Sequence, residues 1–182
     1  MIEKLTLLFA KKTGHVLALL TRAADPEAAV KPDELTAQAL PVRYVGDTTR
    51  SWIRLVRFFV PVDELDAQTV DFDELVLNNP LGYFLDADKN VQALDQTLRV
   101  TGVTSPAGHT QVQVTINTPA TADANVLIHV TDGNLELTLS GKITSGANFV
   151  NINVGQTLAA GTYYALTLVA GLPPNSYDFT VT

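Results

Sequence analysis

The segments Asn125-Val-Leu-Ile-His-Val130 and Asn134-Leu-Glu-Leu-Thr-Leu139 decide the fold, because both are apolar-rich runs of strand length. Asp132-Gly133 stands between them, and Asp-Gly between two such runs is a strong signal for a β-hairpin. The alternation in Gln111-Val-Gln-Val-Thr-Ile116 predicts a further strand whose apolar side chains face a core. These segments favour antiparallel strands over helices.

The same pattern continues from residue 98 to residue 182. Strand candidates are separated by turns rich in Gly, Pro, Asn or Ser about every twelve residues, which is typical of a β-sandwich. The seven predicted strands are 98–103, 110–116, 125–130, 134–139, 148–154, 162–169 and 176–182.

Leu158-Ala-Ala-Gly161-Thr-Tyr163 precedes the last strand but one and resembles the L-x-x-G-x-Y phrase found there in many Ig-like domains. The resemblance implies that the Tyr163 hydroxyl bonds back to the backbone a few residues upstream, with Leu158, Gly161 and Tyr163 forming a structural corner. Residues 98–182 thus resemble a cysteine-free Ig-like domain of the bacterial and phage type. The core Trp of antibody domains is missing, and the alternatives are another sandwich or a simple turn-to-strand junction.

Charge divides the chain unevenly. The chain has 12 Lys and Arg residues and 19 Asp and Glu residues, and only six of all these charged residues lie between residues 99 and 182. We therefore expect hydroxyl and amide groups to coat the sandwich. The sequence predicts an all-β, mainly β protein with two domains. Residues 1–97 form a small β-rich docking or assembly domain that resembles no family, and residues 98–182 form the seven-stranded Ig-like β-sandwich.

Within residues 1–97, residues 3–22 predict a hairpin whose loop is Lys11-Lys12-Thr13-Gly14. Pro32-Asp-Glu-Leu35 predicts a short helix, since Pro and acidic residues suit a first turn. Residues 39–45 predict a strand. Residues 51–60 fit a strand better than a helix, although Arg50, Arg54 and Arg57 have helical spacing.

Composition narrows the function classes. A net charge of −7 argues against binding of nucleic acid, which requires clustered Lys and Arg. There are no cysteines to form disulfides or thiolate metal sites. No apolar run reaches the roughly 18 residues of a membrane span, and the amino terminus lacks the basic and apolar regions of a signal peptide. We therefore expect the protein to be made in the cytoplasm without membrane insertion. Release as part of a particle is one route by which it could leave the cell.

One segment has partial metal-site spacing. Asp86-Ala-Asp88-Lys-Asn90 matches the first ligands of a calcium loop, but the sixth position is Val91 instead of Gly. A polar hairpin turn with Asx-type hydrogen bonds explains the same residues. We expect no metal and no cofactor.

Catalytic signatures are missing from the sequence, and we expect no enzyme. The three histidines, His15, His109 and His129, are isolated, and no nucleophile or phosphate-binding motif is present. The acidic residues between 63 and 74 could supply a carboxylate pair for glycoside hydrolysis, with Asp63, Asp71 and Glu74 as candidates. A solvated acidic loop that contacts a basic partner is the favoured interpretation.

Interaction residues are predicted mainly in the first domain. The residues of one segment have the composition of an interface hot spot: Trp52, Arg54, Arg57, Phe58 and Phe59. A place in the core is the favoured interpretation for Trp52 and the two Phe, which leaves Arg54 and Arg57 as the interface charges. The hairpin at 3–22 would offer an edge for strand addition by a neighbouring subunit, and Lys11 and Lys12 at its tip would limit uncontrolled pairing. The candidate interface residues are Lys11, Lys12, Arg54, Arg57, Asp63, Glu64, Asp71 and Asp73.

These features favour a non-enzymatic structural or interaction protein that docks by its first domain and displays the second. Assembly in the cytoplasm would suit a subunit or decoration of a phage particle or a phage-tail-like contractile injection particle, with protein partners in a symmetric homo-oligomer. The alternative is a carbohydrate- or receptor-binding module that uses Tyr164, Asn148 and Asn151. A hydrolase with an accessory sandwich is a third class.

Overall fold

The computed structural model describes residues 4–22, 30–45 and 55–182, and every structural statement below concerns these residues. The fold is mostly β, with antiparallel sheets throughout, as predicted. The first part contains β1 (Lys4–Ala10), β2 (Val16–Arg22), α1 (Pro32–Leu35), β3 (Ala39–Val45), β4 (Leu55–Pro61), the 3-10 turn η1 (Val62–Glu64), β5 (Leu65–Asp71), α2 (Glu74–Asn78), the 3-10 turn η2 (Pro80–Gly82), β6 (Tyr83–Leu85) and β7 (Val91–Ala93).

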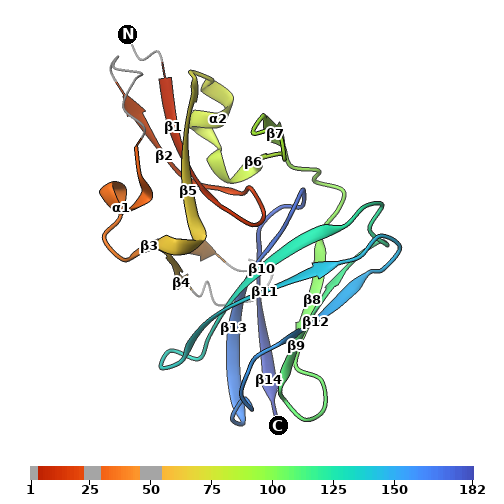
Figure 1. Cartoon of the computed structure of the whole chain (residues 1–182). Helices are drawn as coiled ribbons and strands as arrows, with labels where there is room; N and C mark the ends of the chain where they lie inside the picture. The colour runs from red at the N-terminus through yellow and green to blue at the C-terminus, as the bar shows by residue number, and fades with distance from the viewer. Residues whose placement is uncertain (1–3, 23–29, 46–54) are drawn as a thin grey trace.

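The second part is a sandwich built from β8 (Val100–Thr104), β9 (Gln111–Ile116), β10 (Ala124–Thr131), β11 (Glu136–Ile143), β12 (Phe149–Asn153), β13 (Gly161–Val169) and β14 (Asn175–Val181). Each corresponds to one of the seven predicted strands. One sheet has the order β11-β10-β13-β14 and the other the order β12-β9-β8 (Figure 1). The Asp132-Gly133 turn connects β10 to β11 as expected, and Gly133 has a positive φ of 97°.

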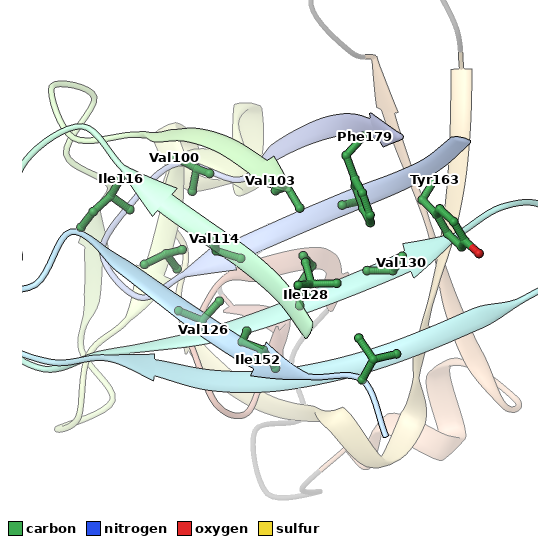
Figure 2. Packing of buried hydrophobic residues seen from close by; sticks show 14 of the residues in the cluster. Val100, Val103, Val114, Ile116, Val126, Ile128, Val130, Ile152, Tyr163 and Phe179 are labelled. Carbon is green, nitrogen blue, oxygen red and sulfur yellow. The ribbon is translucent and has the colours of Figure 1, made fainter. Parts of the chain in front are cut away.

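The sandwich core follows from strand alternation. Figure 2 shows Val126, Ile128 and Val130 of β10 directed toward Val114 and Ile116 of the facing sheet. Alternate residues of a strand point to opposite faces, so one apolar set per strand is enough to fill the space between the sheets.

The corner adopts the geometry implied by the sequence resemblance. Tyr163 is 2% exposed, and its hydroxyl donates a 3.0 Å hydrogen bond to the Ala159 carbonyl oxygen. Its ring stacks on Phe179 of β14 with centroids 5.5 Å apart. Leu158 is buried in the same core, so the corner joins the loop before β13 to both the sheet and the core.

The first part is organised around β1. Its sheet has the order β2-β1-β5, and both faces of β1 are covered. Leu5, Leu7 and Phe9 pack on α2 and β6, while Leu8 and Ala10 belong to a second cluster. The predicted hairpin at 3–22 is therefore a central element with one neighbouring strand on each side of β1.

That second cluster includes residues from both parts of the chain. Leu127 of β10 and Leu166 and Leu168 of β13 are at most 1% exposed, and they contact the cluster that contains Phe58 and Val60 of β4. We call this contact the seam: the outer face of β10 and β13 packed against the first part. The expectation that hydroxyls and amides coat the sandwich is wrong for this face, because apolar side chains cover it and the first part buries them.

Two sequence interpretations need correction or qualification. The acidic stretch between 63 and 74 is not a solvated loop, because Leu65–Asp71 forms β5 and pairs with β1. In β5 only Leu65 is buried, so no apolar alternation marked it as a strand. The strand predicted at 51–60 is present as β4 from Leu55, whereas Trp52 and Arg54 lie outside the described residues.

The hairpin loop between β1 and β2 contacts the strand β6. Gly14 has a φ of 75°, and a Cβ built there would lie 2.1 Å from the Leu85 carbonyl oxygen. The Leu85 amide also donates a 2.9 Å hydrogen bond to the Gly14 carbonyl oxygen. Glycine is therefore required at this position both by conformation and by space.

We expect Gly14→Ala to lower the free energy of unfolding by about 3 kcal/mol or more, since backbone must move to relieve the clash. Gly133→Ala is the matched control. Gly133 also has a positive φ, but open space surrounds the position of its Cβ. Its cost should therefore be only about 1 kcal/mol. Urea unfolding of both variants measures the difference, and equal costs would contradict the tight contact with Leu85.

Tyr163→Phe should lower the free energy of unfolding by about 1 kcal/mol, because it removes one hydrogen bond and leaves the stacked ring in place. Tyr163→Ala should cost about 3–5 kcal/mol, because it also empties part of the core. Thermal and urea unfolding measure both. A Phe variant as stable as the original protein would show that the corner hydrogen bond contributes nothing.

Candidate functional site

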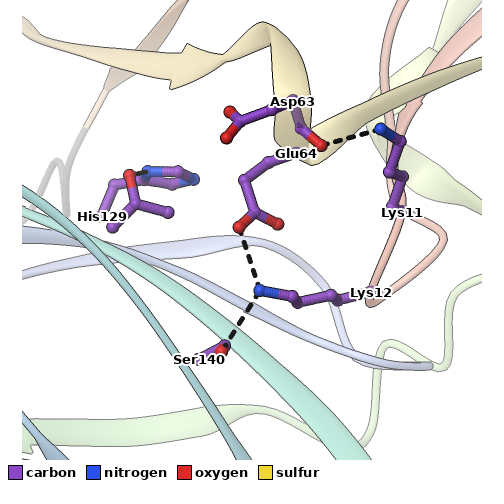
Figure 3. Close-up of polar contacts among 7 residues, drawn as sticks. Lys11, Lys12, Asp63, Glu64, His129 and Ser140 are labelled. Atoms are coloured by element: carbon purple, nitrogen blue, oxygen red, sulfur yellow. Dashed lines mark hydrogen bonds and ion pairs between the residues drawn. The ribbon is translucent and has the colours of Figure 1, made fainter.

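The hairpin tip forms the polar border of the seam. The Lys11 ammonium donates a 2.8 Å hydrogen bond to the Asp63 carbonyl oxygen. Lys12 makes a 2.9 Å ion pair with the Glu64 carboxylate and a 3.3 Å hydrogen bond to the Ser140 hydroxyl of β11 (Figure 3). Lys12 thus connects β11 of the sandwich with η1 of the first part.

A second contact at the tip strengthens this connection. The Asn125 side-chain amide donates a 3.0 Å hydrogen bond to the Lys12 carbonyl oxygen. Lys11, Lys12 and Glu64, which the sequence suggested as interface residues, therefore make contacts within the chain. Whether they also meet a partner stays a prediction.

His15 lies directly behind the tip and is completely buried. Its Nε2 is 2.7 Å from the Leu172 carbonyl oxygen, and its Nδ1 is 2.9 Å from the Thr13 hydroxyl. A carbonyl oxygen only accepts, so Nε2 carries the hydrogen and the Thr13 hydroxyl donates to Nδ1. Burial lowers the pKa of His15 to about 4, against the opposing effect of the Leu172 carbonyl. The ring is therefore neutral, and it joins the hairpin loop directly before β2 to the loop after β13.

His129 belongs to the outer face of β10 and is 4% exposed. Its Nδ1 is 2.9 Å from the Thr138 hydroxyl on the neighbouring strand β11. Its Nε2 is buried and has no hydrogen-bond partner among the residues that the structure describes. Burial lowers the pKa of His129 to about 4, so this ring is also neutral.

A pocket of about 150 Å³ lies beside His129, where β4 crosses the outer face of β10 and β11. β4 contributes Phe58 and Phe59 to its walls, and the sandwich contributes His129 and Thr138. The pocket is therefore formed only when the two parts of the chain are packed together.

The strand β5 separates the predicted acidic residues into two groups, with Asp63 and Glu64 before it and Asp71, Asp73 and Glu74 at its far end. Asp71 pairs with Lys4 at 2.5 Å, and the Lys4 ammonium lowers the pKa of the Asp71 carboxyl. Asp73 caps α2 by accepting a 2.8 Å hydrogen bond from the Leu75 amide. Asp63 belongs to η1, before β5, and Asp71 is the last residue of β5. The length of that strand, about 20 Å at the usual rise per residue, separates them by more than the distance between a glycosidase carboxylate pair.

The calcium-like segment is a turn in the structure. The Asp86 carboxylate accepts hydrogen bonds from the Asn90 amide at 2.9 Å and the Asp88 amide at 3.0 Å. Those bonds lower the pKa of Asp86, with the Asn90 bond the strongest cause. Across residues 4–22, 30–45 and 55–182, no group of three His, Asp or Glu side chains is arranged to hold a metal ion.

Arg57 is exposed and lines the pocket, whereas the predicted interface partner Arg54 lies outside the described residues. Tyr164 belongs to the four-stranded sheet and Asn151 to the facing one, so the three residues suggested for sugar binding do not form one patch. Within the described part of the chain, no helix has the length and apolar character needed to cross a membrane.

No protein-family model matches this sequence, and no curated protein matches it. The candidate site, at the seam and in the pocket beside His129, is therefore defined by its geometry alone.

Sequence reasoning missed the roles of both buried histidines. The available signal was the unbroken apolar run in Val126-Leu-Ile-His-Val130, since strands buried on both faces lack alternation. His129 within such a run is expected to be buried whichever way it points. The burial of His15 gave no comparable signal, because it depends on Leu172, 157 residues away.

We expect acid to destabilise the fold between about pH 6.5 and pH 4. Both histidines have folded pKa values near 4, below the usual histidine value of 6.5, so the unfolded state binds protons first as the pH falls. Their stabilisation is complete above about pH 6.5 and is lost as the pH falls toward 4. Each should contribute a loss of about 2 kcal/mol between pH 7.5 and pH 5.

Urea unfolding at pH 7.5 and pH 5 tests this expectation. His129→Leu should remove about half of the loss, because it leaves His15 as the one remaining histidine of the buried pair. Asp carboxylates with lowered pKa values act at lower pH and leave this window unaffected. A free energy of unfolding that is the same at both pH values would contradict the buried neutral state of both rings.

Proposed function

We propose that this chain is a non-enzymatic structural or interaction protein, a subunit or decoration of a large assembly of phage or phage-tail-like type. It docks by its first part and displays the sandwich, which we take to be Ig-like. The strand order, with three strands facing four, and the Tyr163 corner support the Ig-like assignment.

The distribution of exposed apolar side chains carries the proposal. Large apolar residues with substantial exposure lie mainly in the first part: Leu20 43%, Phe59 42%, Phe72 41% and Leu75 68%, against Phe149 47% in the sandwich. Apolar side chains that form one exposed patch favour contact with another protein, whereas apolar residues exposed singly do not. Phe72 and Leu75 are close in sequence, at the junction of β5 and α2, and are the preferred docking residues.

The sandwich offers a different kind of surface. The outer face of β9 and β12 is uncharged and mostly polar, with the Gln113 side-chain amide donating a 2.9 Å hydrogen bond to Asn151. Phe149 is the exposed apolar residue on the same face. The start of β1 and the C-terminus lie at opposite ends of the molecule (Figure 1). A docked first part would therefore hold this neutral face away from the assembly.

A carbohydrate- or receptor-binding module is the second candidate. The exposed neutral amides of β9 and β12 favour it over a hydrolase, since uncharged amides bind sugar hydroxyls well. Binding on a glycan array that is lost in Asn151→Ala would support this candidate.

Size-exclusion chromatography with light scattering tests the docking proposal. At micromolar concentration we expect a symmetric oligomer that Leu75→Glu converts to monomer. Phe149→Glu, a matched change at an exposed apolar residue of the sandwich, should leave the oligomer intact. Low-resolution images of the oligomer should show closed rings or tubes.

A strict monomer for the original protein, alone and with candidate partner proteins, would count against the proposal. An oligomer that Phe149→Glu breaks and Leu75→Glu does not would place the docking surface on the sandwich and would overturn it equally.

A further inference from the structure

The edges of the larger sheets differ in what lies beside them. In the sandwich, β11 lies beside β12 and β14 lies beside β8, so the edge strands of its two sheets meet in pairs. In the first part, the sheet order β2-β1-β5 makes β2 and β5 the edges. β2 pairs with β1 through a bulge, and His15, directly before it, is bridged to Phe84 of β6. β5 has no bulge, and β1 is its one strand neighbour in the part of the chain that the structure describes.

The hydrogen-bond pattern shows which backbone groups of β5 face outward. The Lys11 amide donates a 2.9 Å hydrogen bond to the Glu64 carbonyl oxygen, which continues the ladder between β1 and β5. Hydrogen-bonded and non-hydrogen-bonded pairs alternate in an antiparallel ladder. The residues of β5 that bond to β1 are therefore Asp66, Gln68 and Val70. The residues whose amide and carbonyl groups point away from β1 are Leu65, Ala67, Thr69 and Asp71.

Two of these outward groups are satisfied locally. The Leu65 amide donates to the Val62 carbonyl oxygen of η1, and the Ala67 amide donates a 2.9 Å hydrogen bond to the Asp66 carboxylate. The others make no hydrogen bond to any residue within 4–22, 30–45 or 55–182. They belong to a strand whose residues 66–70 are all partly exposed. Such a row of unpaired backbone groups is a template for pairing with a further strand.

The side chains of β5 do not protect this edge. Natural edge strands exclude further strands by means of Pro, bulges or charged residues, especially Lys. β5 contains neither Pro nor Lys. Its Asp71 pairs with Lys4 at 2.5 Å, and its Asp66 lies 4.0 Å from the Lys89 ammonium. Lysines of the same chain thus balance both carboxylates, and the edge has no net charge to repel a second copy.

The strand β5 is complementary to itself about a two-fold axis. An antiparallel pair centred on Gln68 is the register that uses all seven residues of both strands. Ala67 then lies opposite Thr69 of the second copy, and Leu65 lies opposite Asp71. These are the residues whose backbone groups point outward, so they form the hydrogen-bonded pairs that an antiparallel ladder requires.

The side chains are compatible in this register. Asp66 lies opposite Val70, and Asp71 lies opposite an apolar residue, so no carboxylate faces another. The Ala67 amide exchanges the Asp66 carboxylate for the carbonyl oxygen of Thr69 in the second copy. We propose that two copies of this chain associate through β5, which joins two three-stranded sheets into one sheet of six strands.

This inference rests on the proposed docking through the first part, and it names a second copy as the partner. Phe72 and Leu75, the preferred docking residues, follow directly after β5 and are exposed. In the register centred on Gln68, Phe72 of one copy comes next to η1 of the other. In strand addition the backbone hydrogen bonds supply affinity, and the side chains beside them supply specificity. The exposed apolar residues and the edge therefore form one continuous surface.

Single-cysteine variants test the pairing and its register, because the chain has no cysteine of its own. Gln68→Cys places two thiols opposite each other in a non-hydrogen-bonded pair, where side chains lie closest. Diamide oxidises two thiols to a disulfide and is itself reduced to the hydrazine. We expect it to cross-link most of this variant into a covalent dimer. Val70→Cys, on the same face of the strand, would lie opposite Asp66 instead of its own copy and should remain mainly monomeric on a denaturing gel.

A matched pair of variants at Thr69 tests the backbone hydrogen bonds. Thr69→Pro removes an amide that points away from β1, so the ladder to β1 stays intact. Thr69→Val removes only the side-chain hydroxyl and keeps this amide. In sedimentation equilibrium we expect the dissociation constant of the dimer to rise about tenfold or more for the Pro variant and to change little for the Val variant. Circular dichroism establishes folding, and if the Pro variant does not fold, cross-linking of Gln68→Cys still decides the question.

The outcomes separate this inference from the docking proposal. If Leu75→Glu breaks the oligomer but Gln68→Cys does not cross-link, the β5 pairing is overturned and docking through the first part stands. Equal cross-linking of Gln68→Cys and Val70→Cys would also overturn the pairing, because random collisions would explain both. A dimer that Thr69→Pro leaves unchanged would contradict it as well. A strictly monomeric original protein would overturn both proposals together.

Discussion

The structure depends on the packing of the outer face of β10 and β13 against the first part of the chain. Leu127, Leu166 and Leu168 supply the sandwich side of this seam, and each contributes about 1.5–3 kcal/mol when fully buried. The first part needs this surface, because the side of its sheet that holds Leu8 and Ala10 would otherwise face water together with Phe58 of the β4 strand. Each part therefore completes the core of the other.

Polar groups then fix the relative position of the two parts. His15 reaches the Leu172 carbonyl and Lys12 reaches Ser140, so two residues near one hairpin tip bind two different elements of the sandwich. The buried hydrogen bond of His15 requires specific geometry, because an unpaired buried group costs more than a bond gains. The pocket beside His129 arises from the same packing, since β4 forms one wall and β10 and β11 form the other.

Strand positions in the sandwich were predictable because turns and alternation are local signals in the sequence. The Tyr163 hydrogen bond was predictable from the six-residue motif Leu158–Tyr163. The seam was not predictable in the same way. Leu166 and Leu168 alternate with Ala165 and Thr167 of the same strand, and the sequence does not say that both faces are buried. β5 was missed because its side chains are polar and only its backbone pairing with β1 makes it a strand. Contacts such as that of His15 with Leu172 join residues far apart in sequence, and a single sequence carries no mark of them.

Native-state hydrogen exchange on the full chain tests the seam most directly. If the two parts complete each other, the amides of β1 and of β10 exchange with the same opening free energy, and Leu166→Ala lowers both by the same amount, about 2–5 kcal/mol. Loss of protection in β10 with β1 unchanged, or the reverse, would contradict the account, because the two parts would then open as independent domains.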